Sequence, residues 1–205
     1  TILLLLSTVF GAISGVGIWF TIGVVHPAAT SSLIHTFVWA WATEWAFFLL
    51  EVVTALAWVA TWEKVSPRTH LLLIWLYAFS AFMSLVVIQG ILGFMLTPGA
   101  FPTTASFRDG FLNPTYLPGV LFRTGLCLAL AAAWMAFAAL REKDRAARAR
   151  LSRVLGGVGA LGLALAAAGW FVWEKALPES VQRLFLGEKP LLATLATGRS
   201  HTFRI

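Results

Sequence analysis

The sequence predicts an all-α integral membrane protein, a bundle of about five transmembrane helices. Of the 205 residues, 59% are hydrophobic and only 12% are charged, and the mean hydropathy is +0.83. Soluble domains carry about 25% charged residues, so this composition indicates a chain that lies in lipid. Five apolar segments each reach the roughly 20 residues that a helix needs to cross a bilayer, and no strand-like alternation favours a β-barrel. The segments are Ile2–Val25, Thr36–Trp62, Leu71–Leu96, Tyr116–Leu140 and Val154–Trp173.

The first, third and fifth segments contain no charged residue. Ile2–Val25 follows Thr1 directly and lacks the short apolar core and small-residue cleavage site of a signal peptide, so we expect a membrane span. The fifth segment is rich in Gly and Ala between Gly156 and Gly162, a composition that suits close helix packing in lipid.

The second segment contains two glutamates, Glu44 and Glu51. Seven residues are close to two helical turns, so both side chains fall on one face, about 10 Å apart along the axis. A carboxyl group in hydrocarbon costs several kcal/mol, so it normally faces a protein interior and has a function there. We therefore expect the pair to transfer protons. The alternative is a structural pair whose partners are Arg123 and neighbouring hydroxyl groups.

Polar residues follow one another at seven-residue steps at the third segment: His70 directly precedes it, and Tyr77 and Ser84 lie within it. Because this spacing places them on one helix face, they could carry protons from the cytoplasm toward the glutamates. Ordinary hydrogen bonding between membrane helices explains the same pattern equally well.

The fourth segment is interrupted by Arg123. A guanidinium group stays protonated and has no lone pair for iron, so Arg123 cannot be a haem ligand. It could pair with Glu44 or Glu51 or hold a haem propionate, and the alternative is that its side chain extends to the outer interface.

The basic residues predict the orientation in the membrane. Residues 141–153 carry six basic and two acidic residues, and Lys64 and Arg68 oppose Glu63 in the loop after the second segment. The loops at 26–35 and 97–115 are neutral overall. The positive-inside rule then places 63–69, 141–153 and the N-terminus in the cytoplasm, with a five-helix bundle at 1–173 and an extracytoplasmic tail at 174–205. The net charge of +6 thus reflects topology, and we expect no nucleic-acid partner.

Between about Gly11 and Leu140, an ordered set of motifs resembles subunit I of the cytochrome bd quinol oxidases. In chain order these are Gly11-Ala-Ile-Ser-Gly15, the Glu44–Glu51 helix, Trp62 with an acidic and a basic residue, His70 with Trp75, Gly90 with Met95 and Pro98, and Asn113-Pro114. The resemblance implies helices two to six of that subunit, glutamates that line a haem and proton region, haem b and quinol as cofactors, and a bacterial inner (cytoplasmic) membrane location.

The chain also departs from the family. The family's first helix with a haem-ligating histidine and its C-terminal half are absent, and Leu121-Phe-Arg123-Thr124 stands where a low-spin haem histidine is expected. The two glutamates are seven residues apart where the family has eight, and the quinol-binding loop is at best a stub at 174–205. The chain alone therefore cannot form a three-haem oxidase.

Two histidines, His26 and His35, flank the first outer loop, on the side where the family holds its haems. Imidazole is a common axial ligand of b-type haem. Neither position is a ligand in the family, and an exposed loop histidine is usually only a polar loop residue. His26, at a helix end before Pro27, is the better candidate.

We expect a membrane subunit of a respiratory electron-transfer complex that passes electrons between quinol and a partner redox subunit, with protons moving through the glutamates. Its partners would be other membrane subunits, lipid and a periplasmic cytochrome. The main alternative is a haem-free structural or anchor subunit. A small transporter or proton channel and one half of a split oxidase also stay open. The sequence contains no covalent haem motif, Walker loop or dinucleotide fingerprint, and no metal site other than haem iron is expected.

Overall fold

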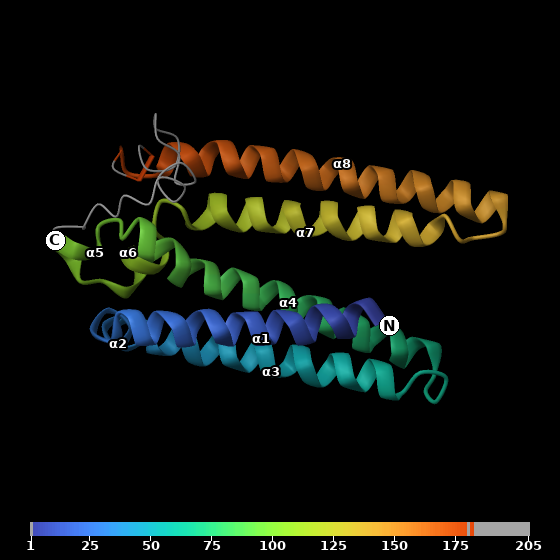
Figure 1. The fold of residues 1–205 in the computed structure, drawn as a ribbon, viewed down its shortest axis with the longest axis horizontal. Helices are drawn as coiled ribbons and strands as arrows, with labels where there is room; N and C mark the ends of the chain where they lie inside the picture. Colours follow the sequence, from blue (N-terminus) through green and yellow to red (C-terminus); the bar gives the residue numbers. More distant parts are fainter. Residues whose placement is uncertain (1, 180, 183–205) are drawn as a thin grey trace, which may run out of the picture. The chain divides into compact units, whose positions relative to one another are not determined.

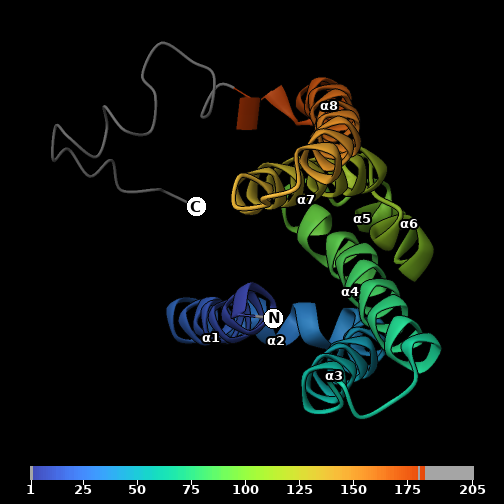
Figure 2. The same cartoon turned by 90° about the vertical axis from the view of Figure 1, so that its right-hand side faces the viewer.

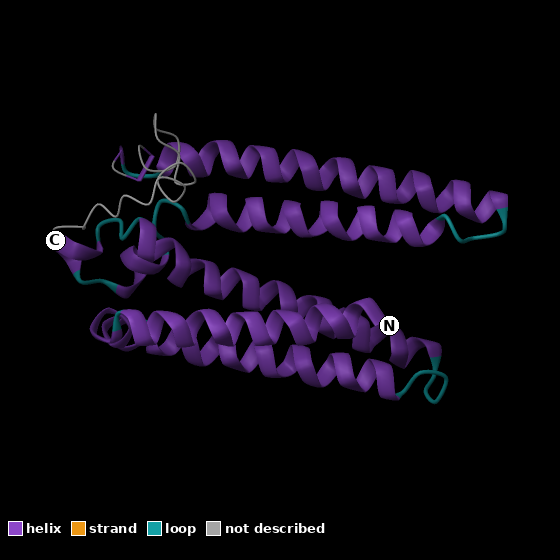
Figure 3. Ribbon diagram, viewed as in Figure 1, coloured by secondary structure: helices purple, strands orange, loops and turns teal. Residues whose placement is uncertain are grey.

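The computed structural model describes residues 2–179, 181 and 182, which form helices and no strand (Figures 1 and 3). Most of the predicted tail at 174–205 lies outside the described residues. Five of the helices are long and apolar enough to cross a membrane, which confirms the predicted class. The helices are α1 (Ile2–Val25), α2 (Pro27–Thr36), α3 (Val38–Ala60), α4 (Pro67–Leu96), α5 (Phe101–Thr104), α6 (Phe107–Phe111), α7 (Tyr116–Ala139) and α8 (Arg145–Ala176).

Two of the spanning helices begin earlier than the apolar segments. α4 begins at Pro67, whose fixed φ suits the first helical position, and the Ser66 hydroxyl accepts a hydrogen bond from the Thr69 amide at 3.2 Å. α8 begins at Arg145, where the Asp144 carboxylate accepts from the Ala146 amide at 2.9 Å. Helix α8 thus begins before the apolar segment that starts at Val154, because a cap followed by Ala and Arg favours helix. The cytoplasmic location of 141–153 stays a prediction.

The connection at 26–35 is a helix and not the loop expected, because residues Pro27–Thr36 form α2. Its location on the outer side stays a prediction. His26 is its N-cap and accepts a hydrogen bond through Nδ1 from the Ala29 amide at 3.3 Å. Pro27 occupies the first helical position, which needs no backbone N–H. The turn at 97–115 likewise contains the two short helices α5 and α6.

The chain divides into two compact units, residues 1–92 and 93–205. The first unit holds α1, α2, α3 and most of α4, and α3 and α4 run antiparallel because only six residues join them (Figure 1). The second unit holds the whole of α5, α6, α7 and α8, together with the last residues of α4. Helices α7 and α8 form a hairpin and lie side by side in both views (Figures 1 and 2).

Glycines permit the close approach of α7 and α8. A Cβ atom added to Gly162 would lie 2.6 Å from the backbone N of Ala129, and one added to Gly169 would lie 2.9 Å from the backbone O of Pro118. Gly125 faces the backbone of Ala166 in the same way. The small-residue packing expected for the fifth span is therefore present at Gly162, whereas Gly156 has no neighbour within 4 Å.

The Asn113-Pro114 motif closes the turn between α4 and α7. The Asn113 side-chain amide donates to the carbonyl of Gly110 at 3.0 Å, and its Oδ1 accepts from the Thr115 hydroxyl at 3.0 Å. The hydroxyls of Thr97 and Thr115 are 2.6 Å apart, and all three polar side chains are buried. These hydrogen bonds give the buried polar side chains their partners, so Asn113 stabilises the fold of this turn.

Candidate functional site

The candidate site is the seam between α3 and α4, where three pairs of side chains meet at regular intervals. α3 contributes residues 44, 51 and 58, and α4 contributes residues 84, 77 and 70. Because the helices run in opposite directions, a step of seven residues along one matches a step of seven back along the other. Successive pairs are therefore about 10 Å apart along the seam.

The first pair is Glu44 and Ser84. The Ser84 hydroxyl donates a hydrogen bond to Oε1 of Glu44 at 3.0 Å, and both side chains are partly buried. A hydroxyl group donates one proton and also accepts, so Ser84 can bind this carboxyl in either protonation state.

The second pair is Glu51 and Tyr77, whose side chains lie close to each other across the seam. The Tyr77 hydroxyl also lies beside the buried hydroxyl of Thr8, so α1 covers this pair. Glu51 therefore lies on the same face of α3 as Glu44, opposite α4.

The third pair joins Trp58 and His70. Nε2 of His70 lies 3.0 Å from the carbonyl oxygen of Trp58, so Nε2 carries the proton and donates it. The imidazole stacks on the Trp58 ring with centroids 5.0 Å apart and meets the edge of Trp62 at 4.9 Å. His70 is thus held rigidly at the end of the seam, next to the loop that contains Lys64.

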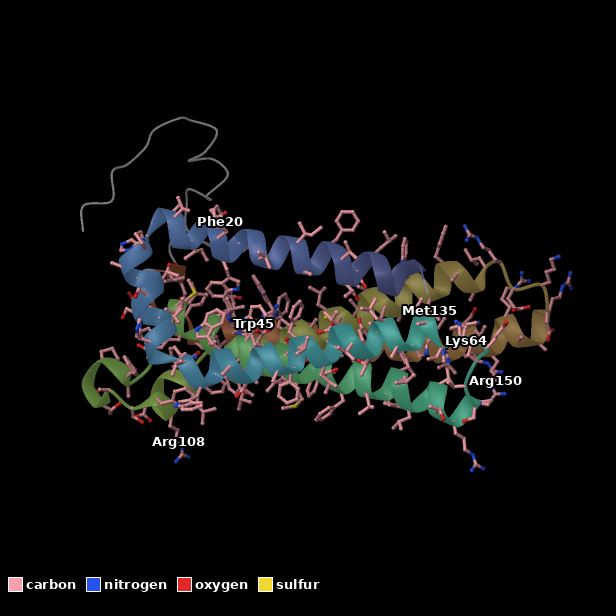
Figure 4. The ribbon with its side chains drawn as sticks, turned by 90° about the horizontal axis from the view of Figure 1, so that it is seen from below. Phe20, Trp45, Lys64, Arg108, Met135 and Arg150 are labelled. Carbon is pink, nitrogen blue, oxygen red and sulfur yellow. The ribbon has the colours of Figure 1, made fainter. Side chains whose placement is uncertain are left out.

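A cavity of about 250 Å³ lies beside Glu44, between α1, α3 and α4. Trp45 lines it from the side of α3 that faces α1 (Figure 4). Its other lining residues are Gly11, Ala12, Gly15, Val16, Trp19, Trp41, Glu44, Phe48 and Ile88. The indole nitrogen of Trp41 is buried here without a hydrogen-bond partner among the described residues.

The two candidate haem histidines differ in the nitrogen that each leaves available. Nδ1 of His26 accepts a hydrogen bond from a backbone amide, so the neutral ring carries its proton on Nε2. Nδ1 of His35 lies 2.7 Å from the carbonyl of Ser31 and must donate to it, which leaves the Nε2 lone pair available. Ligand histidines usually donate their other ring nitrogen in this way, so His35 and not His26 has the tautomer that suits iron.

The described geometry limits where a haem could lie. Neither His26 nor His35 is among the residues that line the cavity beside Glu44, so that cavity does not fit a haem whose iron this chain ligates. No group of three or more His, Cys, Asp or Glu side chains is arranged for a metal ion in the described part of the chain. Binding of haem by His26 or His35 stays a prediction.

Arg123 lies on the second turn of α7, in the second unit, and its side chain is partly buried. Its neighbour Phe122 packs against Trp170 of α8 with ring centroids 5.5 Å apart. Pairing of Arg123 with Glu44 or Glu51, or with a haem propionate, stays a prediction.

Two residues of the site escaped the sequence analysis, Trp58 and Trp41. Trp58 follows Glu51 by seven residues, so the spacing that links the glutamates was a signal for it. Trp41 precedes Glu44 by three residues and so shares its helix face. Neither tryptophan stands out in the sequence, because tryptophan is common in membrane helices, where it is enriched near the membrane–water interface.

Comparison with known proteins gives no relative. No protein-family model matches this sequence, and searches of curated proteins and of solved structures find no match. The resemblance to subunit I of the cytochrome bd oxidases therefore stays a prediction from the motifs.

Proposed function

We propose that this chain is a multi-pass subunit of a respiratory electron-transfer complex in the bacterial inner (cytoplasmic) membrane, and that it moves protons along the seam between α3 and α4. The observation that carries the proposal is the hydrogen bond by which Ser84 of α4 donates to Glu44 of α3, together with the position of the Tyr77 hydroxyl beside Glu51. Quinol would supply the protons and electrons, and a partner redox subunit, such as a periplasmic cytochrome, would receive the electrons.

The chemistry of the seam supports this role. A protonated carboxyl group and a hydroxyl group both donate and accept, so the hydroxyl of each pair can accept a proton on one side while it gives up its own on the other. The step of about 10 Å between pairs exceeds a hydrogen bond and requires water between them. In the proposed orientation the N-terminus and His70 lie at the cytoplasmic side, and Glu44 lies nearest the outer side.

The proposal assigns haem b to the outer end of the first unit, with His35 as its ligand from this chain. Haem would supply one-electron transfer to the partner subunit. His35 suits this position because its Nδ1 donates a hydrogen bond to the Ser31 carbonyl, which leaves the lone pair of Nε2 for iron.

The test is proton release by the complex reconstituted in lipid vesicles, followed with a pH-sensitive dye during quinol oxidation. Glu44→Gln and Glu51→Gln keep the size of the side chain but cannot ionise, so we expect proton release to slow by about 10². Glu63→Gln is the matched control, because Glu63 is exposed in the loop between the same two helices. Unchanged release in both seam variants would refute the proposal.

A haem-free structural subunit is the second candidate, and one observation favours it. The hairpin of α7 and α8 packs backbone against backbone at Gly162 and Gly169, which makes a rigid element that could hold a larger partner. In that case both seam variants would leave turnover intact, and the purified chain would lack the b-type absorption that the reduced-minus-oxidised spectrum of a haem subunit displays.

A further inference from the structure

The end of the α7–α8 hairpin concentrates positive charge where two membrane spans end (Figure 1). Residues 141–153 carry six basic and two acidic side chains. The Glu142 carboxylate accepts a hydrogen bond from the Asp144 amide at 3.1 Å, and the Asp144 carboxylate accepts from the Ala146 amide at 2.9 Å. Neither carboxylate forms an ion pair with a basic side chain of the described residues. This end of the hairpin therefore attracts anions.

One face of α7 connects this charge to the apolar span. At steps of four, three and four residues it carries Leu130, Trp134, Phe137 and Arg141, which we call the lipid face. Its three apolar side chains are 62%, 51% and 57% exposed, in chain order. An exposed apolar face on a spanning helix contacts lipid chains or another subunit.

The lipid face points away from α8. Ala132 of α7 lies opposite Gly159 of α8, since a Cβ atom added to that glycine would be 3.4 Å from the Ala132 Cβ. Trp134 follows Ala132 by two residues, a rotation of about 200°, so it lies on the far side of α7. The partner helix of the hairpin therefore leaves this face uncovered.

Arg141 forms the charged end of the lipid face. Its guanidinium carbon lies over the Phe137 ring, 5.7 Å from the centroid, and Phe137 stacks in turn on Trp134 at 6.2 Å. A guanidinium group above a ring keeps the N–H donors at its edge for other partners. The planar fork of these donors matches two oxygens of a phosphate group.

The length of the lipid face matches one leaflet of a bilayer. Leu130 and Arg141 are eleven residues apart, which is about 16 Å along a helix, and the hydrocarbon of one leaflet is about 15 Å thick. A phospholipid presents the same order over the same length, with a phosphate at the surface and an acyl chain below it. This match favours a lipid over an acidic segment of a partner protein.

We propose that the lipid face binds an anionic phospholipid, with its phosphate on Arg141 and an acyl chain along Phe137, Trp134 and Leu130. Net charge selects among phospholipids, because phosphatidylcholine carries the same phosphate as phosphatidylglycerol but adds a quaternary ammonium group. The basic residues around Arg141 repel that ammonium group, whereas they attract a lipid with a net negative charge.

This inference goes beyond the proposed function and does not depend on it. The lipid face lies in the second unit of the chain, whereas the seam between α3 and α4 lies in the first. Proton transfer along the seam could fail while the lipid still binds, and loss of the lipid site would leave the seam groups in place.

The experiment is native mass spectrometry of the purified protein in detergent, titrated with phosphatidylglycerol or with phosphatidylcholine of the same acyl chains. We expect the first phosphatidylglycerol to bind at least about fivefold more tightly, the equivalent of the attraction of one basic residue for an anionic lipid. Glycerophosphoglycerol, the same headgroup without acyl chains, should not displace it. That arm of the experiment distinguishes a lipid site from a site for a free phosphate compound.

Two variants with matched controls test the residues. Arg141→Gln removes the phosphate contact and should weaken phosphatidylglycerol binding at least about tenfold, whereas Arg150→Gln removes the same charge from α8 and should change it little. Phe137→Ala removes the ring below Arg141 and should also weaken binding. Met135→Ala, at an equally exposed apolar position on another face of α7, should not.

The proposal is overturned if the two phospholipids bind alike, or if glycerophosphoglycerol displaces phosphatidylglycerol. It is also overturned if Arg141→Gln and Arg150→Gln weaken binding equally, since the charge of the whole region and not a site would then attract the lipid. All four substituted side chains are exposed, so we expect the variants to fold, and circular dichroism checks this. If Phe137→Ala does not fold, the two arginine variants decide the question.

Discussion

At the scale of single residues, the orientation of a few side chains decides what this protein can do. Glu44 and Glu51 lie in a helix whose other residues would suit lipid, yet each meets a hydroxyl of α4. The histidines are distinguished in the same way, because the atom that each ring nitrogen contacts fixes its tautomer. Residue type alone did not separate His26 from His35, and the role of either as a haem ligand stays a prediction.

The Ser84 hydroxyl gives the first prediction. Ser84→Ala removes the hydrogen bond to Glu44 and so breaks the proposed proton path at this pair, and we expect proton release during quinol oxidation to fall about tenfold or more. Ser80→Ala is the control, because this buried hydroxyl on the same helix donates to the carbonyl of Leu76. Each variant should lose about 1 kcal/mol of folding stability. If proton release falls equally in both, the cause is lost stability and not a broken proton path.

At the scale of elements, short-range spacing predicted the long helices well and their ends poorly. The seven-residue spacing placed Glu44 and Glu51 on one face of α3, and His70, Tyr77 and Ser84 on one face of α4, because a helix repeats every 3.6 residues. Hydropathy cannot detect helical turns that contain charged residues, so it missed the start of α8 at Arg145. It also missed α2, whose signal was His26 followed by Pro27.

The packing of α7 against α8 gives the second prediction. Gly162→Leu places a side chain where even a Cβ would be 2.6 Å from the backbone of Ala129, so the hairpin must separate. Overpacking of this kind costs typically about 1–3 kcal/mol, which a thermal-unfolding scan in detergent should register as a lower Tm. Gly156→Leu lies on the same helix with nothing within 4 Å, and an equal loss there would contradict the packing account.

The N-terminus of α8 gives the third prediction. Asp144→Ala removes the carboxylate that accepts from the Ala146 amide, at a cost of about 1 kcal/mol to the first turn. Hydrogen exchange at the amides of 146–148 should become faster, while Asp144→Asn, which can still cap, should protect them nearly as well. Equal protection in Asp144→Ala would mean that the cap does not hold this turn.

At the scale of the whole molecule, the five spanning helices leave much of their apolar surface open. Phe20 on α1 is 73% exposed and Trp39 on α3 is 79% exposed, and such surfaces in a membrane protein face lipid or a partner subunit. The sequence predicted this class because composition and segment length alone determine it. The cavity beside Glu44 could not be predicted, since it depends on how α1 lies against α3 and α4.

The central claim is that Glu44 and Glu51 change protonation when the complex turns over. Infrared difference spectroscopy of the complex, reduced minus oxidised, tests this most directly, because protonated carboxyl groups absorb apart from the rest of the protein. We predict a carboxyl difference band that shifts in heavy water, weakens in Glu44→Gln and in Glu51→Gln, and stays unchanged in Glu63→Gln. A band that survives in both seam variants, or the absence of any carboxyl band, would contradict the account.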